Sequence, residues 1–106
     1  MPSDMAARYE LFLKDLETIV NVDSGSGYAP GLAAVAGFFQ ERFERLGWHT
    51  RRLDFEAGGV PCLEVVNRRG LEAKGRLDFL FLGHMDTVFP QGTAGRRPFS
   101  LRDGRA

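Results

Sequence analysis

The run Leu77–Leu82 is the sequence feature that most constrains the fold. It contains four consecutive large apolar residues, Phe79 to Leu82, and Asp78 is its one polar residue. A short run as apolar as this is typical of a strand that is buried on both faces of a sheet. We therefore expect residues 77–82 to form a central strand.

Two helices are predicted before this run. Apolar residues recur at spacings of three and four, which places them on one face of a helix. The first helix is expected from about Ser3 to Asn21, with Asp4 near its start, where a carboxylate suits the helix dipole. The second is expected to begin at Pro30 and to end before Gly47, which is expected to form a left-handed cap. The apolar positions are Tyr9, Phe12, Leu13, Leu16, Ile19 and Val20, then Leu32, Val35, Ala36, Phe39, Phe43 and Leu46.

The pattern then changes to the alternation of strands. Residues 50–56 and 62–67 are predicted to form a hairpin around a turn at residues 57–59. A polar connection follows at residues 68–76, and residues 98–101 are predicted to form a short strand before an Asp103-Gly104 turn. The predicted fold class is α/β, with two helices packed on a mixed β-sheet in one domain, residues 1–106.

Composition excludes several classes of function. The 106 residues contain 14 basic and 14 acidic side chains, so the net charge is zero, which argues against non-specific binding to nucleic acid or membranes. A single cysteine, Cys62, rules out a disulfide framework. The N-terminus shows no signal peptide, and no apolar run is long enough to span a bilayer. We expect a soluble, cytoplasmic protein.

His84 and Asp86 are the strongest candidates for chemistry. They follow the predicted strand in Gly83-His84-Met85-Asp86-Thr87, and ligands bind at the carboxyl ends of strands in open α/β sheets. Side chains two apart on extended backbone point to the same side. His84 could therefore bind a metal while Asp86 orients its ring. The alternative from these residues alone is a pair that merely hydrogen-bonds in a loop.

Other candidates are weaker. His49 is predicted to have a surface or packing role, and Cys62 to be a small, buried strand residue. Residues 24–27, Ser-Gly-Ser-Gly, lack the Gly-Lys-Ser/Thr ending of a phosphate loop and are interpreted as a connection. The arginines of the C-terminal stretch are expected to be solvated, and the phenylalanines of the two helices to be core. These are Arg96, Arg97, Arg102 and Arg105, and Phe12, Phe38, Phe39 and Phe43.

Residues 82–88, Leu-Gly-His-Met-Asp-Thr-Val, resemble the first metal-binding motif of the zinc-dependent aminoacylase and carboxypeptidase family. This family includes acetylornithine deacetylase, succinyl-diaminopimelate desuccinylase and the glutamate carboxypeptidases, which are the most similar subgroup. The loop at 24–27, the Leu-Gly-Trp at 46–48 and the segment from Pro98 to Gly104 also resemble the opening third of these proteins, in order.

The resemblance implies roles for two residues. His84 matches a ligand of one of two zinc ions, and Asp86 matches the active-site acid that hydrogen-bonds this ligand. In the family, the two zinc ions activate a bridging water and polarise the scissile carbonyl. The implied activity is that of a hydrolase, a metallopeptidase or carboxypeptidase acting on a peptide or an N-acyl amino acid, and family members are often homodimers.

The sequence also departs from the family. The bridging Asp, the Glu-Glu pair, a further acidic ligand and the last His have no counterpart in the 106 residues, whose histidines are His49 and His84. We therefore expect a truncated N-terminal part of a catalytic domain, without the dimerisation domain and inactive alone. The alternative is a short non-catalytic binding or regulatory protein that associates with a partner chain.

Overall fold

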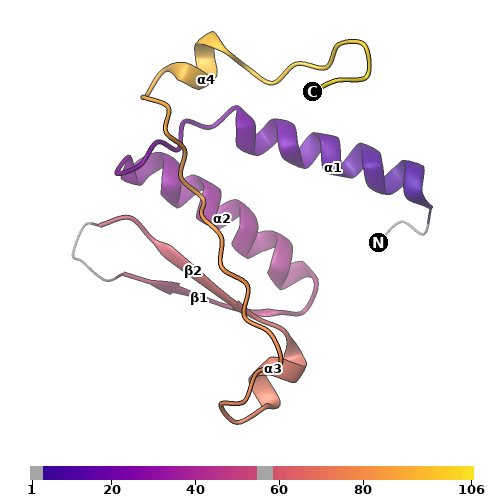
Figure 1. The fold of residues 1–106 in the computed structure, drawn as a ribbon, viewed down its shortest axis with the longest axis vertical. Helices are drawn as coiled ribbons and strands as arrows, with labels where there is room; N and C mark the ends of the chain where they lie inside the picture. Colours follow the sequence, from indigo (N-terminus) through magenta and orange to yellow (C-terminus); the bar gives the residue numbers. More distant parts are fainter. Residues whose placement is uncertain (1–3, 55–58) are drawn as a thin grey trace.

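The computed structural model describes residues 4–54 and 59–106, which combine helices with one antiparallel hairpin (Figure 1). The helices are α1 (Met5–Val20), α2 (Ala29–Arg45), α3 (Arg68–Glu72) and α4 (Thr93–Arg96). The strands are β1 (His49–Leu53) and β2 (Cys62–Val66). The general α/β class is therefore confirmed, and α3 and α4 are short helices that the sequence pattern did not predict.

The ends of the two long helices follow local rules. The Asp4 carboxylate accepts a hydrogen bond from the Ala7 N–H at 2.8 Å and caps α1. Helix α2 begins at Ala29, one residue before the predicted Pro30. Gly47 has φ +78°, which confirms the left-handed cap after α2.

The predicted hairpin is confirmed. β1 and β2 pair antiparallel, with His49 opposite Val66 and Leu53 opposite Cys62. Residues 55–58, which include the end of the first predicted strand and part of the predicted turn, lie outside the described residues. Helix α2 contacts both strands, partly through polar side chains, since Arg52 Nε donates to Gln40 Oε1 at 3.0 Å and Thr50 Oγ1 to Glu44 Oε1 at 2.6 Å.

The apolar core lies on one helix. Among the described residues, the buried apolar side chains are Leu32, Val35 and Ala36, all on α2. The prediction that Phe12 belongs to the core is wrong, because its side chain is exposed; Phe38, Phe39 and Phe43 are half-buried. Helix α1 therefore has little apolar cover on the face that its sequence pattern predicted to be buried.

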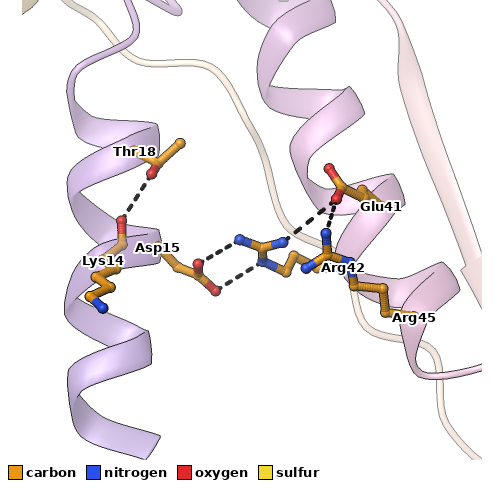
Figure 2. A network of polar contacts seen from close by, with 6 residues as sticks. All are labelled: Lys14, Asp15, Thr18, Glu41, Arg42 and Arg45. Carbon is orange, nitrogen blue, oxygen red and sulfur yellow. Dashed lines mark hydrogen bonds and ion pairs between the residues drawn. The ribbon is translucent and has the colours of Figure 1, made fainter. Parts of the chain in front are cut away.

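An ion pair joins α1 to α2. Arg42 donates from Nη2 to Asp15 Oδ1 at 2.8 Å and from Nε to Asp15 Oδ2 at 3.1 Å (Figure 2). Glu41 lies on the other side of the guanidinium, 3.9 Å from Arg42 Nη1. The hydrogen bonds that Arg42 donates to Asp15 raise the pKa of Arg42, which stays charged.

The expectation of a central strand at residues 77–82 is wrong. In the described parts of the chain no strand pairs with this run, and Phe81 and Leu82 are 89% and 88% exposed. A strand buried on both faces needs partners at its edges, and β1 and β2 pair with each other instead. The Phe79 and Phe81 rings stack at 6.3 Å between centroids, as alternate side chains on extended backbone do.

The C-terminal stretch also differs in part from prediction. Residues 98–101 form no strand, and the Phe99 N–H instead donates to Asn21 Oδ1 at 2.8 Å. The Asp103-Gly104 turn is confirmed, with φ of 51° and 72° and a bridge between Arg102 and Arg105. Positive φ at both central residues defines the type I′ turn that Asp-Gly favours.

Candidate functional site

The candidate site lies where two segments far apart in the sequence run side by side. The Thr87 N–H donates to the Ser24 carbonyl at 2.8 Å, and the Ser26 N–H donates to the Thr87 carbonyl at 2.9 Å. These bonds form a parallel bridge between Gly25 and Thr87. A Cβ on Gly25 would lie 2.4 Å from the Phe89 carbonyl oxygen, so glycine permits this approach. The backbone thus sets the loop at 24–27 against the His84–Asp86 segment.

His84 and Asp86 contact each other, which both the predicted ligand pair and the alternative of a hydrogen-bonded pair in a loop require. His84 Nδ1 lies 3.1 Å from Asp86 Oδ1 and 2.9 Å from the Asp86 carbonyl oxygen. A carbonyl and an ionised carboxylate only accept hydrogen bonds, so Nδ1 must be the donor. In the neutral ring, Nε2 then holds the free electron pair. The His84 side chain is 82% exposed, which leaves Nε2 accessible to a ligand.

Ser26 holds the second oxygen of the same carboxylate. Its hydroxyl donates to Asp86 Oδ2 at 2.5 Å. This bond is the first cause of a lowered pKa of Asp86, and the hydrogen bond from His84 adds to it. Sequence reasoning missed Ser26, which was interpreted as part of a simple connection. No spacing signal could have found it, because the contact spans 60 positions.

Asp23 fixes the far side of the same loop. Its carboxylate accepts hydrogen bonds from the Gly92 N–H at 2.8 Å and the Ala94 N–H at 2.9 Å, at the start of α4. These backbone bonds, Ala94 first, lower the pKa of Asp23. Sequence reasoning missed this residue too. An Asp is a recognisable helix-cap signal only when the N–H groups that it caps follow closely in the sequence, and those of Gly92 and Ala94 do not.

A cavity of about 420 Å³ opens beside the pair. It lies between the end of α1, α2 and the segment from His84 to Arg97, with Val35 and Phe39 among its walls. Arg97 also lines the cavity, with its guanidinium 5.5 Å from the centre of the Phe89 ring. The site therefore joins a mostly apolar hollow to one imidazole, two carboxylates (Asp23 and Asp86) and one guanidinium.

The described residues do not fit a complete zinc site. A catalytic zinc takes three protein ligands, and no group of three or more His, Cys, Asp or Glu lies together in residues 4–54 and 59–106. His49 and Cys62 lie on the hairpin, and both are exposed. The prediction that Cys62 is buried is wrong, because residue 62 lies at the exposed end of β2. His84 remains a single potential ligand.

Comparison with known proteins yields one partial match. The chain is similar to carboxypeptidase G2 of Pseudomonas sp. (strain RS-16), with 32% identity over 94 residues. The match covers 89% of this chain and 22% of the relative, so the chain spans about a fifth of that protein's length. No protein-family model and no solved structure matches the chain. The match supports a glutamate carboxypeptidase-like relationship.

Within the part of the chain that the structure describes, no helix is long and apolar enough to cross a membrane.

Proposed function

We propose that this chain forms the first part of the catalytic domain of a zinc-dependent metallopeptidase or amidohydrolase that resembles the glutamate carboxypeptidases. The reaction is hydrolysis of an amide bond next to a free carboxylate. The observation that supports it best is the His84–Asp86 pair. An ionised carboxylate holds Nδ1, and the exposed Nε2 is free to bind a metal. The partial match to carboxypeptidase G2, which spans 89% of this chain, also supports the proposal.

In this proposal His84 is a zinc ligand and Asp86 orients it. The remaining ligands and the general base come from residues other than those of this chain. The 106-residue chain is then inactive by itself, since one imidazole holds zinc weakly and leaves no defined open position. Appreciable zinc-dependent hydrolysis by the purified chain would contradict this part of the proposal.

A chimaera tests the proposed role directly. Residues of this chain replace the matching stretch of carboxypeptidase G2, and hydrolysis of an N-acyl glutamate is measured. The chimaera is expected to be active, His84→Ala to abolish hydrolysis, and Asp86→Asn to reduce it by about 10- to 100-fold, the usual effect of losing a partner of a metal ligand. His49→Ala, a histidine on β1, is the matched control and retains activity. A fully active His84→Ala chimaera refutes the proposal.

A second candidate function follows from the exposed run at residues 77–82. A short non-catalytic chain that binds a partner through this surface accounts for five exposed apolar side chains in one segment. This candidate needs no metal at His84. The chimaera distinguishes the two, because a pure binding protein supplies no ligand to the carboxypeptidase site.

A further inference from the structure

We propose that the cavity beside the candidate site binds a small carboxylic acid with an apolar body. This inference goes beyond the proposed function, because it needs neither a metal nor hydrolysis. The cavity volume of about 420 Å³ lies in the range of small-molecule sites, about 300 to 1,000 Å³. Such sites combine apolar walls with a few polar groups that fix the orientation of the ligand. The polar groups that carry the inference are the Arg97 guanidinium and the Ser24 hydroxyl.

The walls of the cavity suit the apolar body. Val35 on α2 is 4% exposed, and Phe39, one turn later, is half-buried. Ile19 and Val20 line the cavity from the end of α1, and Met85 lines it from the His84–Asp86 segment. Contact with these side chains removes the apolar body of the acid from water, which favours its binding.

Arg97 is the cation that meets the carboxylate in this proposal. Its guanidinium lies over the Phe89 ring, 5.5 Å from the ring centre. Contact through the face of the guanidinium leaves its N–H donors available, because they lie in the plane of the group. Among the described residues no carboxylate lies within ion-pair distance of Arg97, whereas Arg42 is paired with Asp15. A planar carboxylate matches these N–H donors in charge and shape.

The two carboxylates of the cavity already have partners. Asp23 accepts from two backbone N–H groups at the start of α4, and Asp86 accepts from Ser26 and His84. They therefore need no cation from a ligand. Their charge opposes a bound anion, so we expect modest affinity, with the carboxylate of the ligand on the side of Arg97.

Ser24 supplies a buried polar group to the same cavity. It is 5% exposed, and its hydroxyl forms no hydrogen bond with the described residues. No fully buried polar side-chain atom among those residues lacks a partner, so this hydroxyl must touch open space. The cavity is an open space that Ser24 lines. We expect the hydroxyl to donate to the bound acid, since an ionised carboxylate only accepts hydrogen bonds.

Titration with 3-phenylpropanoate tests the site in the 106-residue chain. The methyl signals of Val35 and Met85 in ¹H–¹³C correlation spectra are expected to shift, with a Kd of about 1 mM for a ligand of this size. The matched ligand is 3-phenylpropanamide, which has the same shape without the charge. It is expected to bind about tenfold more weakly, because it cannot form the charge-assisted hydrogen bonds.

Substitution of the cation is the second test. Arg97→Gln is expected to weaken binding of the acid about tenfold, since charge-assisted hydrogen bonds are lost, and to leave binding of the amide unchanged. Arg102→Gln, an exposed arginine that does not line the cavity, is the matched control and should bind both ligands as the wild type does.

Four results overturn the inference. The first two need no variant: equal binding of acid and amide by the wild type, and no binding of the acid at about 10 mM, ten times the expected Kd. The third is wild-type affinity for the acid in Arg97→Gln. The fourth is a set of shifts that includes Phe79 and Phe81 but not Val35 and Met85, which places the acid on the exposed run. No result depends on hydrolysis, so failure here is distinct from failure of the proposed function.

Discussion

Two carboxylates, those of Asp23 and Asp86, link the loop between α1 and α2 to residues 86–94. Asp23 of the loop accepts from the Gly92 and Ala94 N–H groups, and Asp86 accepts from the hydroxyl of Ser26 in the loop. Both carboxyl groups have a pKa below the ordinary value of 3.8. A group whose pKa is lowered by folding stabilises the folded state above its unfolded pKa, and this contribution is lost as the pH falls through the folded pKa.

Asp23→Asn tests this linkage away from the His84–Asp86 pair. The substitution removes the charge that accepts from Gly92 and Ala94, so the urea midpoint is expected to fall at pH 7. Because the variant has no carboxylate to protonate there, its midpoint should fall less than that of the wild type between pH 6 and pH 3. Glu10→Gln, an exposed position on α1, is the control. An Asp23→Asn variant with wild-type acid sensitivity contradicts the assignment.

The residues of the site were predictable in part. His84 and Asp86 could be identified because their spacing and their place after an apolar run are local signals. Ser26 and Asp23 could not, because their partners lie 60 or more positions away and follow only from the backbone bridge. A serine in a glycine-rich loop has no sequence property that distinguishes a turn residue from one that holds a carboxylate.

At the scale of elements, the ion pair of Asp15 and Arg42 is the clearest side-chain link between α1 and α2 (Figure 2). The two side chains are 37% and 36% exposed, so water screens part of their attraction. The two parallel hydrogen bonds join the helices at one point, and the guanidinium also lies 4.7 Å from the centre of the Phe38 ring.

A double-mutant cycle measures this link. Asp15→Asn, Arg42→Gln and the double variant are compared by urea unfolding, and the coupling free energy is expected to be about 0.5 to 1 kcal/mol, at the upper end for exposed pairs. The coupling should shrink in 1 M NaCl, where the Debye length is about 3 Å. The pair of Arg68 and Glu72 within α3 is the control and should couple less, since both side chains are more exposed. A coupling near zero at low salt contradicts the expected role.

The two long helices and the hairpin were predictable, but the unpaired state of residues 77–82 was not. The 3.6-residue period of α1 and α2 and the alternation of β1 are properties of neighbouring residues, which local sequence contains. Burial on both faces of a sheet depends on strands and helices elsewhere. The apolar run therefore indicates what environment residues 77–82 favour, and the described residues do not provide it.

At the scale of the whole molecule, the chain is thin and open. Its principal extents are 46 × 43 × 19 Å and its radius of gyration is 15.9 Å, against about 13 Å for a compact domain of about 100 residues. Helix α2 lies between α1 and the hairpin (Figure 1). The segment that includes residues 77–91 connects α3 to α4 without forming a helix or a paired strand. Among the residues that the structure describes, no layer covers the apolar run.

The exposed run predicts association. Sedimentation velocity of the wild-type chain is expected to show species heavier than the 11.8 kDa monomer, because Phe79 to Leu82 present a contiguous apolar surface. Phe79→Ser with Phe81→Ser should shift the distribution toward monomer. Met5→Ser, an exposed apolar position on α1, is the control and should not. A monomeric wild type contradicts both the partner-binding candidate and the incomplete catalytic domain.

The bridge between Gly25 and Thr87 also has a consequence for the order of folding. Hairpin β1–β2 closes a short loop around residues 54–61, whereas the bridge closes one about 60 residues long. Chain entropy makes the longer closure costlier by about 2 kcal/mol. The helices and hairpin can therefore form early, and the contact between Ser26 and Asp86 forms after them. The Asp86 carboxylate therefore gains its hydrogen bond from Ser26 only when the chain has brought its two halves together, whereas its contact with His84 is local.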